Sequence, residues 1–82
     1  MDIKMKEKIL NWIKEELFWD GDVDLDISLL DQGIIDSLGV LNLVEFLEKE
    51  FNIKIGDDEV TPENLGSINL MVKFIEKKNE RT

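Results

Sequence analysis

Ser37 stands where a side chain could do chemistry, at the start of a long run of apolar residues with helical spacing. The preceding residue, Asp36, is a favourable N-cap because its side-chain oxygen can accept a hydrogen bond from an amide of the first turn. A hydroxyl next to this cap lies at the positive end of the helix dipole, where unpaired amides favour an attached anion. The sequence therefore predicts that Ser37 presents a hydroxyl suited to carrying an anionic group.

Histidine is absent from the chain, and this limits what Ser37 can do. Serine catalysis normally requires an adjacent base, most often histidine, so only a Glu or Lys base is left open. The G-x-S-x-G elbow of serine hydrolases does not surround Ser37 either. We therefore interpret Ser37 as a hydroxyl that another enzyme modifies, and we expect no catalytic residue and no enzymatic activity.

A second group of candidate residues lies upstream, in an acidic segment. Asp20, Asp22 and Asp24 occupy the first, third and fifth positions of an EF-hand calcium loop. The sixth position requires glycine but holds Leu25, and the twelfth holds Asp31 in place of the longer bidentate glutamate. We interpret this segment as an acidic surface loop and predict no metal site, while a calcium-binding module stays open as an alternative.

Three amphipathic helices must position Ser37, and a short one accompanies them. We predict helices from Asp2 to about Phe18, from Ser37 to about Asn52 and from Ser67 onward, with a short helix that is capped by Thr61 and has Pro62 at its first position. The expected core stripes are Ile9, Leu10, Ile13 and Leu17 in the first helix, Val40, Leu43, Val44, Leu47 and Phe51 in the second, and Ile68, Met71, Val72 and Ile75 in the last.

The connection between the first two predicted helices contains too many apolar residues for a solvated linker. We expect it to cross the end of the bundle and to turn Leu29, Leu30 and either Ile34 or Ile35 inward. Gly33 is expected to supply a turn conformation that a side chain would hinder.

Length and composition indicate the fold class. With 82 residues, the chain allows one domain, spanning residues 1–82, around a small core. We predict an all-α fold: an antiparallel bundle of three main helices plus one short helix, with a long loop between helices one and two. Trp12 and Trp19 are expected to pack at the edge of the first helix and seal the bundle.

The charge of the chain limits its partners. At a formal net charge of −9, the protein repels nucleic acid and anionic membrane surfaces and attracts basic protein surfaces. It has no cysteine for a disulfide or a thiolate metal site and no apolar run long enough to span a bilayer, and we expect it to have no signal peptide. We expect a cytoplasmic, monomeric protein.

The stretch around Ser37 resembles the acyl carrier proteins, a family defined by an Asp-Ser-Leu triplet at the head of its second helix. Here the triplet is Asp36-Ser37-Leu38, and the resemblance extends over nearly the whole chain. The other residues on which the resemblance rests are Gly33, the run Leu43–Phe51, Ile53, Ile55, Thr61–Leu65 and Ser67-Ile68. The resemblance implies that a separate magnesium-dependent transferase attaches 4'-phosphopantetheine from coenzyme A to Ser37 through a phosphodiester.

The resemblance also implies a function. Carriers of this family hold acyl intermediates as thioesters on the arm and present them to enzymes of fatty acid, polyketide or related lipid biosynthesis. Aminoacyl and peptidyl carriers, for example those of the D-alanyl type, share the scaffold and stay open as an alternative. A helical module that only binds other proteins is a further alternative, because serine is frequent at helix starts.

The outer face of the second predicted helix is the expected docking surface. Leu38 and Leu41 point away from the core stripe, so they bury nothing within their own domain. By resemblance, this face meets the phosphopantetheinyl transferase and the enzymes that load and process the carrier. Its expected members are Leu38, Leu41, Asn42, Glu45 and Glu48. Because Gly39 and Asn42 stand where the family often has acids, contacts here should depend more on shape and apolar contact than on charge.

In many members of the family the acyl chain enters a space between helices two, three and four. The candidates to line such a space here are Leu43, Leu47, Ile55, Val60, Leu65 and Met71. A filled core with no cavity is the alternative, because protein interiors are close-packed.

Overall fold

The computed structural model describes residues 2–80, apart from the side chains of Asp2 and Glu80. Within this range it contains helices and no strand. The elements are α1 (Asp2–Glu16), α2 (Ser37–Phe51), the 3-10 turn η1 (Asp57–Glu59), α3 (Pro62–Leu65) and α4 (Ile68–Glu80). The predicted all-α class is confirmed, with three main helices, a short one and a long connection between the first two.

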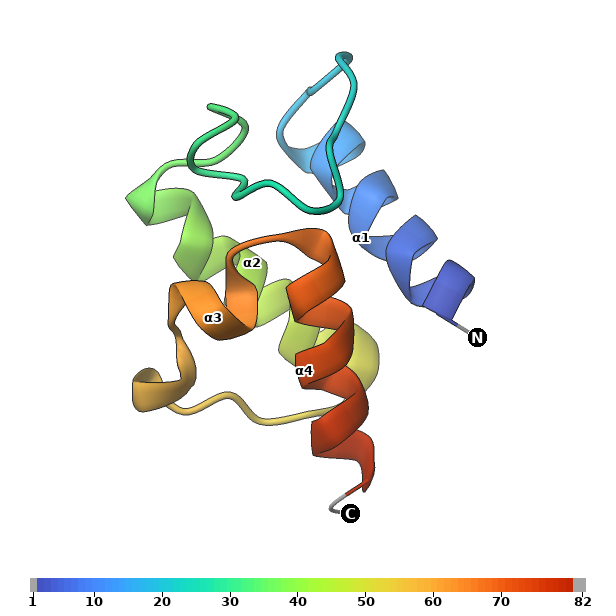
Figure 1. The fold of residues 1–82 in the computed structure, drawn as a ribbon, viewed down its shortest axis with the longest axis vertical. Coiled ribbons are helices and arrows are strands. Elements are labelled where there is room, and N and C mark those ends of the chain that lie inside the picture. Colours follow the sequence, from blue (N-terminus) through green and yellow to red (C-terminus); the bar gives the residue numbers. More distant parts are fainter. Residues whose placement is uncertain (1, 81–82) are drawn as a thin grey trace.

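The direction of each helix follows from the connections (Figure 1). α1 runs upward in that view, whereas α2 and α4 both run downward, because η1 and α3 return the chain to the top between them. α4 packs against α1 and α3. α1 meets α2 through the stacked rings of Trp12 and Phe46, whose centroids lie 5.3 Å apart. A 3.0 Å ion pair between Lys8 and Glu50 joins the same two helices.

The starts of α3 and α4 are fixed by side-chain caps. Thr61 accepts a hydrogen bond from the Asn64 amide, and Pro62 takes the first helical position, where its missing amide costs no hydrogen bond. Oγ of Ser67 accepts a hydrogen bond from the Leu70 amide at 3.3 Å. These caps were predicted from the sequence and are confirmed.

The centres of the predicted stripes lie in the core, together with Leu29, Ile34, Ile35, Ile55, Leu65 and Phe74. The buried members of the stripes are Ile9, Ile13, Leu43, Leu47, Ile68, Met71, Val72 and Ile75. The members that are only partly buried are Leu10, Leu17, Val40, Val44 and Phe51. A bundle this small has a high ratio of surface to volume, so the residues at the flanks of each stripe stay partly exposed to solvent.

The α1–α2 connection is held by its own side chains and by the bundle. The amide group of Gln32 brackets it: Oε1 accepts from the Asp24 amide at 2.9 Å, and Nε2 donates to the carbonyls of Asp24 and Ile27. The Leu29 amide donates to the Gly66 carbonyl at 2.9 Å, which ties the connection to the end of α3. The connection is therefore an ordered part of the fold.

One predicted core residue of this connection is wrong. Leu30 is 52% exposed, whereas Leu29 is buried, as are both Ile34 and Ile35. The amide of Leu29 is bonded to the Gly66 carbonyl, which holds this residue against the end of α3, while the side chain of Leu30 projects from the turn that follows. Gly33 has a φ of 74°, which confirms the predicted need for glycine.

Two predicted helix ends were too late. α1 ends at Glu16, and Phe18 adopts a left-handed φ of 54° with its side chain 89% exposed. α2 ends at Phe51, and Asn52 forms a left-handed C-cap. In both places the apolar pattern continues past the point where the backbone turns, so periodicity alone overestimates the helix.

Candidate functional site

Ser37 is exposed and is the first residue of α2. Asp36 precedes it in an extended conformation, and Oδ1 of Asp36 accepts a hydrogen bond from the Gly39 amide at 2.7 Å. The start of α2 lies at an outer edge of the fold (Figure 1). The structure thus places Ser37 where a large group on its hydroxyl can extend into solvent, and it places Asp36 and Leu38 on either side.

Gly39 holds the inner side of this helix start. It is buried, and a Cβ built on it would lie 2.6 Å from Cγ1 of Ile35. The missing side chain lets Ile35 pack directly against the first turn of α2, so the inner face is closed while Ser37 faces outward. The sequence interpretation treated Gly39 only as a missing acid. A glycine inside a predicted helix was the available sign of close packing.

The predicted docking face is largely exposed. Leu38 is 75% and Leu41 62% exposed, which confirms that both point away from the core. Asn42 and Glu45 are exposed beside them. Large apolar side chains that are exposed to solvent are suited to contact with another protein, particularly when several lie together.

Glu48 differs from the other predicted members of this face. It is only partly exposed, and its Oε2 accepts a hydrogen bond from the Ile55 amide at 2.8 Å. The carboxylate therefore fastens the segment that follows α2. This role was missed because nothing in the local sequence shows which amide will come close seven residues later.

An apolar cavity of about 390 Å³ lies between the α1–α2 connection, α2 and α3. Its lining residues include Leu29, Ile35, Val40, Leu43, Val60 and Leu65. Three of the predicted lining residues are among them, namely Leu43, Val60 and Leu65. The other three, Leu47, Ile55 and Met71, are buried in the core and do not line this cavity.

The aspartates of the acidic segment do not gather around a common point. Among residues 2–80 no group of three or more acidic, histidine or cysteine side chains could hold a metal ion. Two carboxylates stabilise the loop: Oδ1 of Asp24 accepts from the Asp26 amide at 2.9 Å, and Oδ1 of Asp26 accepts from Nδ2 of Asn69 at 2.5 Å. The arrangement therefore offers the calcium alternative no support.

The helices of the described range, residues 2–80, are all too short or too polar to cross a membrane.

The structure is a small helical bundle that presents a solvent-exposed serine at the start of its second main helix. The chain belongs to the phosphopantetheine-binding carrier family, because residues 7–75 match the family model described as "Phosphopantetheine attachment site". The prosthetic group of the family is a covalently attached 4'-phosphopantetheine. Carrier proteins of this kind interact with the enzymes that load and process them.

Individual relatives come from two branches of carriers. The chain is 30% identical over 76 residues to "Probable acyl carrier protein PigG" of Serratia sp. (strain ATCC 39006), covering 89% of this chain and 86% of the relative. It is 36% identical over 75 residues to the "D-alanyl carrier protein" of Streptococcus suis (strain 05ZYH33), covering 92% of each. It is 35% identical over 79 residues to the "Acyl carrier protein" of Buchnera aphidicola subsp. Acyrthosiphon pisum (strain Tuc7), covering 96% of this chain and 78% of the relative.

The fold is also similar to that of a solved structure. A chain in the structure titled "Crystal structure of FAD-dependent dehydrogenase" matches with a TM-score of 0.70 and 26% sequence identity. The match covers 82% of this chain and 97% of that chain.

Proposed function

We propose that this chain is an acyl carrier protein in which Ser37 bears the 4'-phosphopantetheine arm. The carrier holds acyl intermediates as thioesters on that arm and presents them to enzymes of fatty acid, polyketide or related lipid biosynthesis. The observation that carries the proposal is the exposed position of Ser37 at the first residue of α2, within the segment that matches the family.

The residues around Ser37 fit a phosphodiester at this position. The amides of Ser37 and Leu38 belong to the first turn of α2 and have no partner within the helix. These amides would stabilise an anionic group on Ser37, together with the helix dipole. Asp36 satisfies the third amide, that of Gly39, so that the helix starts at the serine in a fixed orientation.

The arm supplies a terminal thiol, which this chain otherwise lacks because it has no cysteine. The protein itself performs no bond-making step in this proposal. Its contribution is to hold the acyl group near the active site of each partner, which raises the effective concentration of the substrate there. The carrier acts as a cytoplasmic monomer, with residues 1–82 forming one domain.

The outer face of α2 is the proposed docking surface for the transferase and for the loading and processing enzymes. Leu38 and Leu41 supply the apolar contact, and Asn42 and Glu45 supply a polar border. Glu48 contributes at the margin, since its carboxylate is already bonded to the Ile55 amide.

The apolar cavity bears on which group the carrier holds. A linear acyl chain fits a hollow lined by Leu43, Val60 and Leu65, and this favours acyl carriage. A D-alanyl carrier is the second candidate, supported by the 36% identity to the Streptococcus suis protein. A D-alanyl group is too small and polar to need the cavity.

Intact mass spectrometry tests the proposal directly. We expect the chain, when co-expressed with a broad-specificity phosphopantetheinyl transferase, to gain the mass of one phosphopantetheine arm. Ser37→Ala should abolish the gain, whereas Ser28→Ala, a serine outside the helix start, should retain it. A wild-type chain that stays unmodified under these conditions would overturn the proposal.

A further inference from the structure

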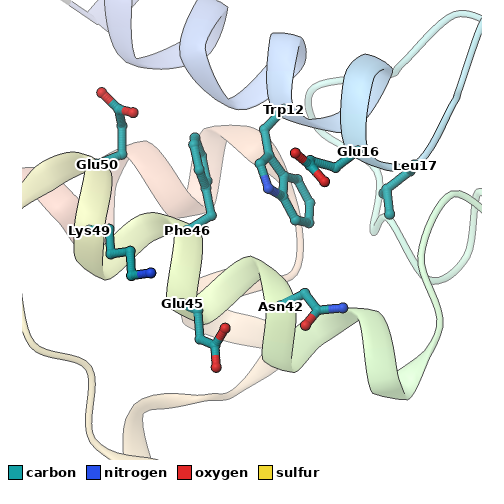
Figure 2. A pocket seen from close by; sticks show the side chains of 8 residues that line it. All are labelled: Trp12, Glu16, Leu17, Asn42, Glu45, Phe46, Lys49 and Glu50. Atoms are coloured by element: carbon teal, nitrogen blue, oxygen red, sulfur yellow. The ribbon is translucent and has the colours of Figure 1, made fainter.

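A second hollow, of about 640 Å³, lies between α1 and α2 and borders the proposed docking surface (Figure 2). Trp12 and Leu17 line it from the side of α1, and Phe46 lines it from α2. The polar residues that complete its lining are Glu16, Asn42, Glu45, Lys49 and Glu50. We call this hollow the α1–α2 groove.

The floor of the α1–α2 groove is aromatic. The Trp12 indole stacks on the Phe46 ring with an interplanar angle of 22°. The rings of Phe46 and Phe51 pack edge to face, with their centroids 6.3 Å apart. Trp12 and Phe46 remain only partly buried despite this packing. Figure 2 shows the indole reaching from α1 toward α2, with Phe46 on one side and the Glu16 carboxylate on the other.

The rim of the α1–α2 groove has an excess of negative charge. Glu50 is neutralised by Lys8 at 3.0 Å. Glu16 and Glu45, by contrast, form no ion pair with any residue between 2 and 80. Both are exposed, and Lys49 is the one basic residue in the described lining.

We propose that the α1–α2 groove binds an arginine side chain of a partner enzyme. A guanidinium is planar, so it stacks on the Trp12 indole while it donates hydrogen bonds to the Glu16 carboxylate beside that ring. Glu45 adds attraction from the facing helix. A lysine ammonium fits less well, because it is a point charge that keeps its hydration.

The partner is a protein because the groove continues the docking surface. Asn42 and Glu45 belong to the exposed face beside Leu38 and Leu41, and they also line the α1–α2 groove. An enzyme that covers the outer face of α2 therefore reaches the groove without a second binding site. In this respect the inference rests on the proposed function, and it extends the docking surface from α2 onto α1.

The two tryptophans provide a built-in control for a binding experiment. Trp12 lies in the groove, whereas the Trp19 indole donates to the Asp22 carbonyl at 3.2 Å in the α1–α2 connection. We suggest titrating the phosphopantetheine-loaded protein with the blocked tripeptide Leu-Arg-Leu and following both indole N–H signals by NMR. Matched peptides carry citrulline, the uncharged isostere, or lysine in place of arginine.

The arginine peptide should shift the Trp12 signal with a saturating curve, while the Trp19 signal stays in place. Citrulline and lysine peptides should bind at least about threefold more weakly, since each lacks either the charge or the planar group. Equal binding of the three peptides, or a Trp12 signal that does not respond to arginine, would overturn the inference.

Charge-removing variants locate the contact. Glu16→Gln should weaken arginine binding about fivefold and Glu45→Gln about twofold, within the range of exposed ion pairs, whereas Lys49→Gln should tighten it. Glu15→Gln, an exposed acid on α1 outside the groove lining, is the matched control and should leave binding unchanged. If the control weakens binding as much as Glu16→Gln, general charge attraction explains the result and the groove does not.

The two proposals fail in different ways. A chain that takes up no phosphopantetheine refutes the carrier function. A chain that takes up the arm on Ser37 but whose Trp12 signal ignores arginine refutes only the groove.

Discussion

The amide of Gly39 donates a 2.7 Å hydrogen bond to Oδ1 of Asp36, across the residue that the proposed function modifies. This bond caps α2, whose first residue is Ser37, at the point where the α1–α2 connection ends. Removing it with Asp36→Ala should lower the free energy of unfolding by about 1 kcal/mol, because the amide loses its cap. Urea denaturation measures the change. Asp36→Asn should retain most of the stability, and an equal loss in both variants would contradict the capping role.

Gly39→Ala should destabilise the protein, although alanine usually favours a helix over glycine by about 0.5 to 1 kcal/mol. The added Cβ meets Cγ1 of Ile35 at 2.6 Å, and overpacking of this kind costs about 1 to 3 kcal/mol. Thermal unfolding of Gly39→Ala with and without Ile35→Ala measures the coupling. In the Ile35→Ala background the penalty should vanish, and an unchanged penalty there would show that the contact with Ile35 is not its cause.

Phe18→Gly should stabilise the protein by about 0.5 to 1 kcal/mol. Phe18 has a left-handed φ of 54° just after α1 and is 89% exposed, so its side chain adds strain and little packing. Phe18→Ala keeps the Cβ and therefore keeps the strain. Chemical denaturation of both variants separates the two effects, and an equal gain in Phe18→Ala would assign the stabilisation to the removal of exposed apolar surface.

Added salt should raise the melting temperature. The net charge of −9 makes the folded chain repel itself, and salt screens that repulsion more than it weakens the ion pairs Lys8–Glu50 and Lys78–Glu59. Glu15→Lys, which makes the net charge two units less negative, should show a smaller rise. A melting temperature that stays constant across a sodium chloride titration would count against this account.

Acyl chains of increasing length on the arm should stabilise the protein until the cavity beside α2 is filled. Each buried methylene contributes about 0.8 kcal/mol, set against the cost of ordering the chain. Melting temperatures of acetyl, hexanoyl and octanoyl forms test this. Val60→Phe places a larger side chain at the cavity lining and should flatten the dependence on chain length. The same slope in Val60→Phe would place the chain outside the cavity.

The start of α2 could be predicted from sequence because its determinants are local. A capping aspartate, an apolar stripe and two outward leucines are all read from neighbouring positions, and the structure confirms the helix start at Ser37 together with the exposure of Leu38 and Leu41. The fold class followed in the same way, from three stripes and the turns between them.

Features that depend on distant parts of the chain were not predictable. Leu29 is held against the end of α3 by its bond to Gly66, far along the sequence, while Leu30 beside it stays exposed. The carboxylate of Glu48 finds the Ile55 amide only after the chain has turned back. The α1–α2 groove forms only when Trp12 of α1 stacks on Phe46 of α2, so the sequence pattern of either helix alone does not predict it.

The bond between the Leu29 amide and the Gly66 carbonyl joins two walls of the apolar cavity. A ligand that widens this cavity must move the α1–α2 connection and the end of α3 together, because moving only one of them would break the Leu29–Gly66 hydrogen bond. In the proposed acyl carrier, we therefore expect the filled and empty forms to differ in the surface position of these two segments.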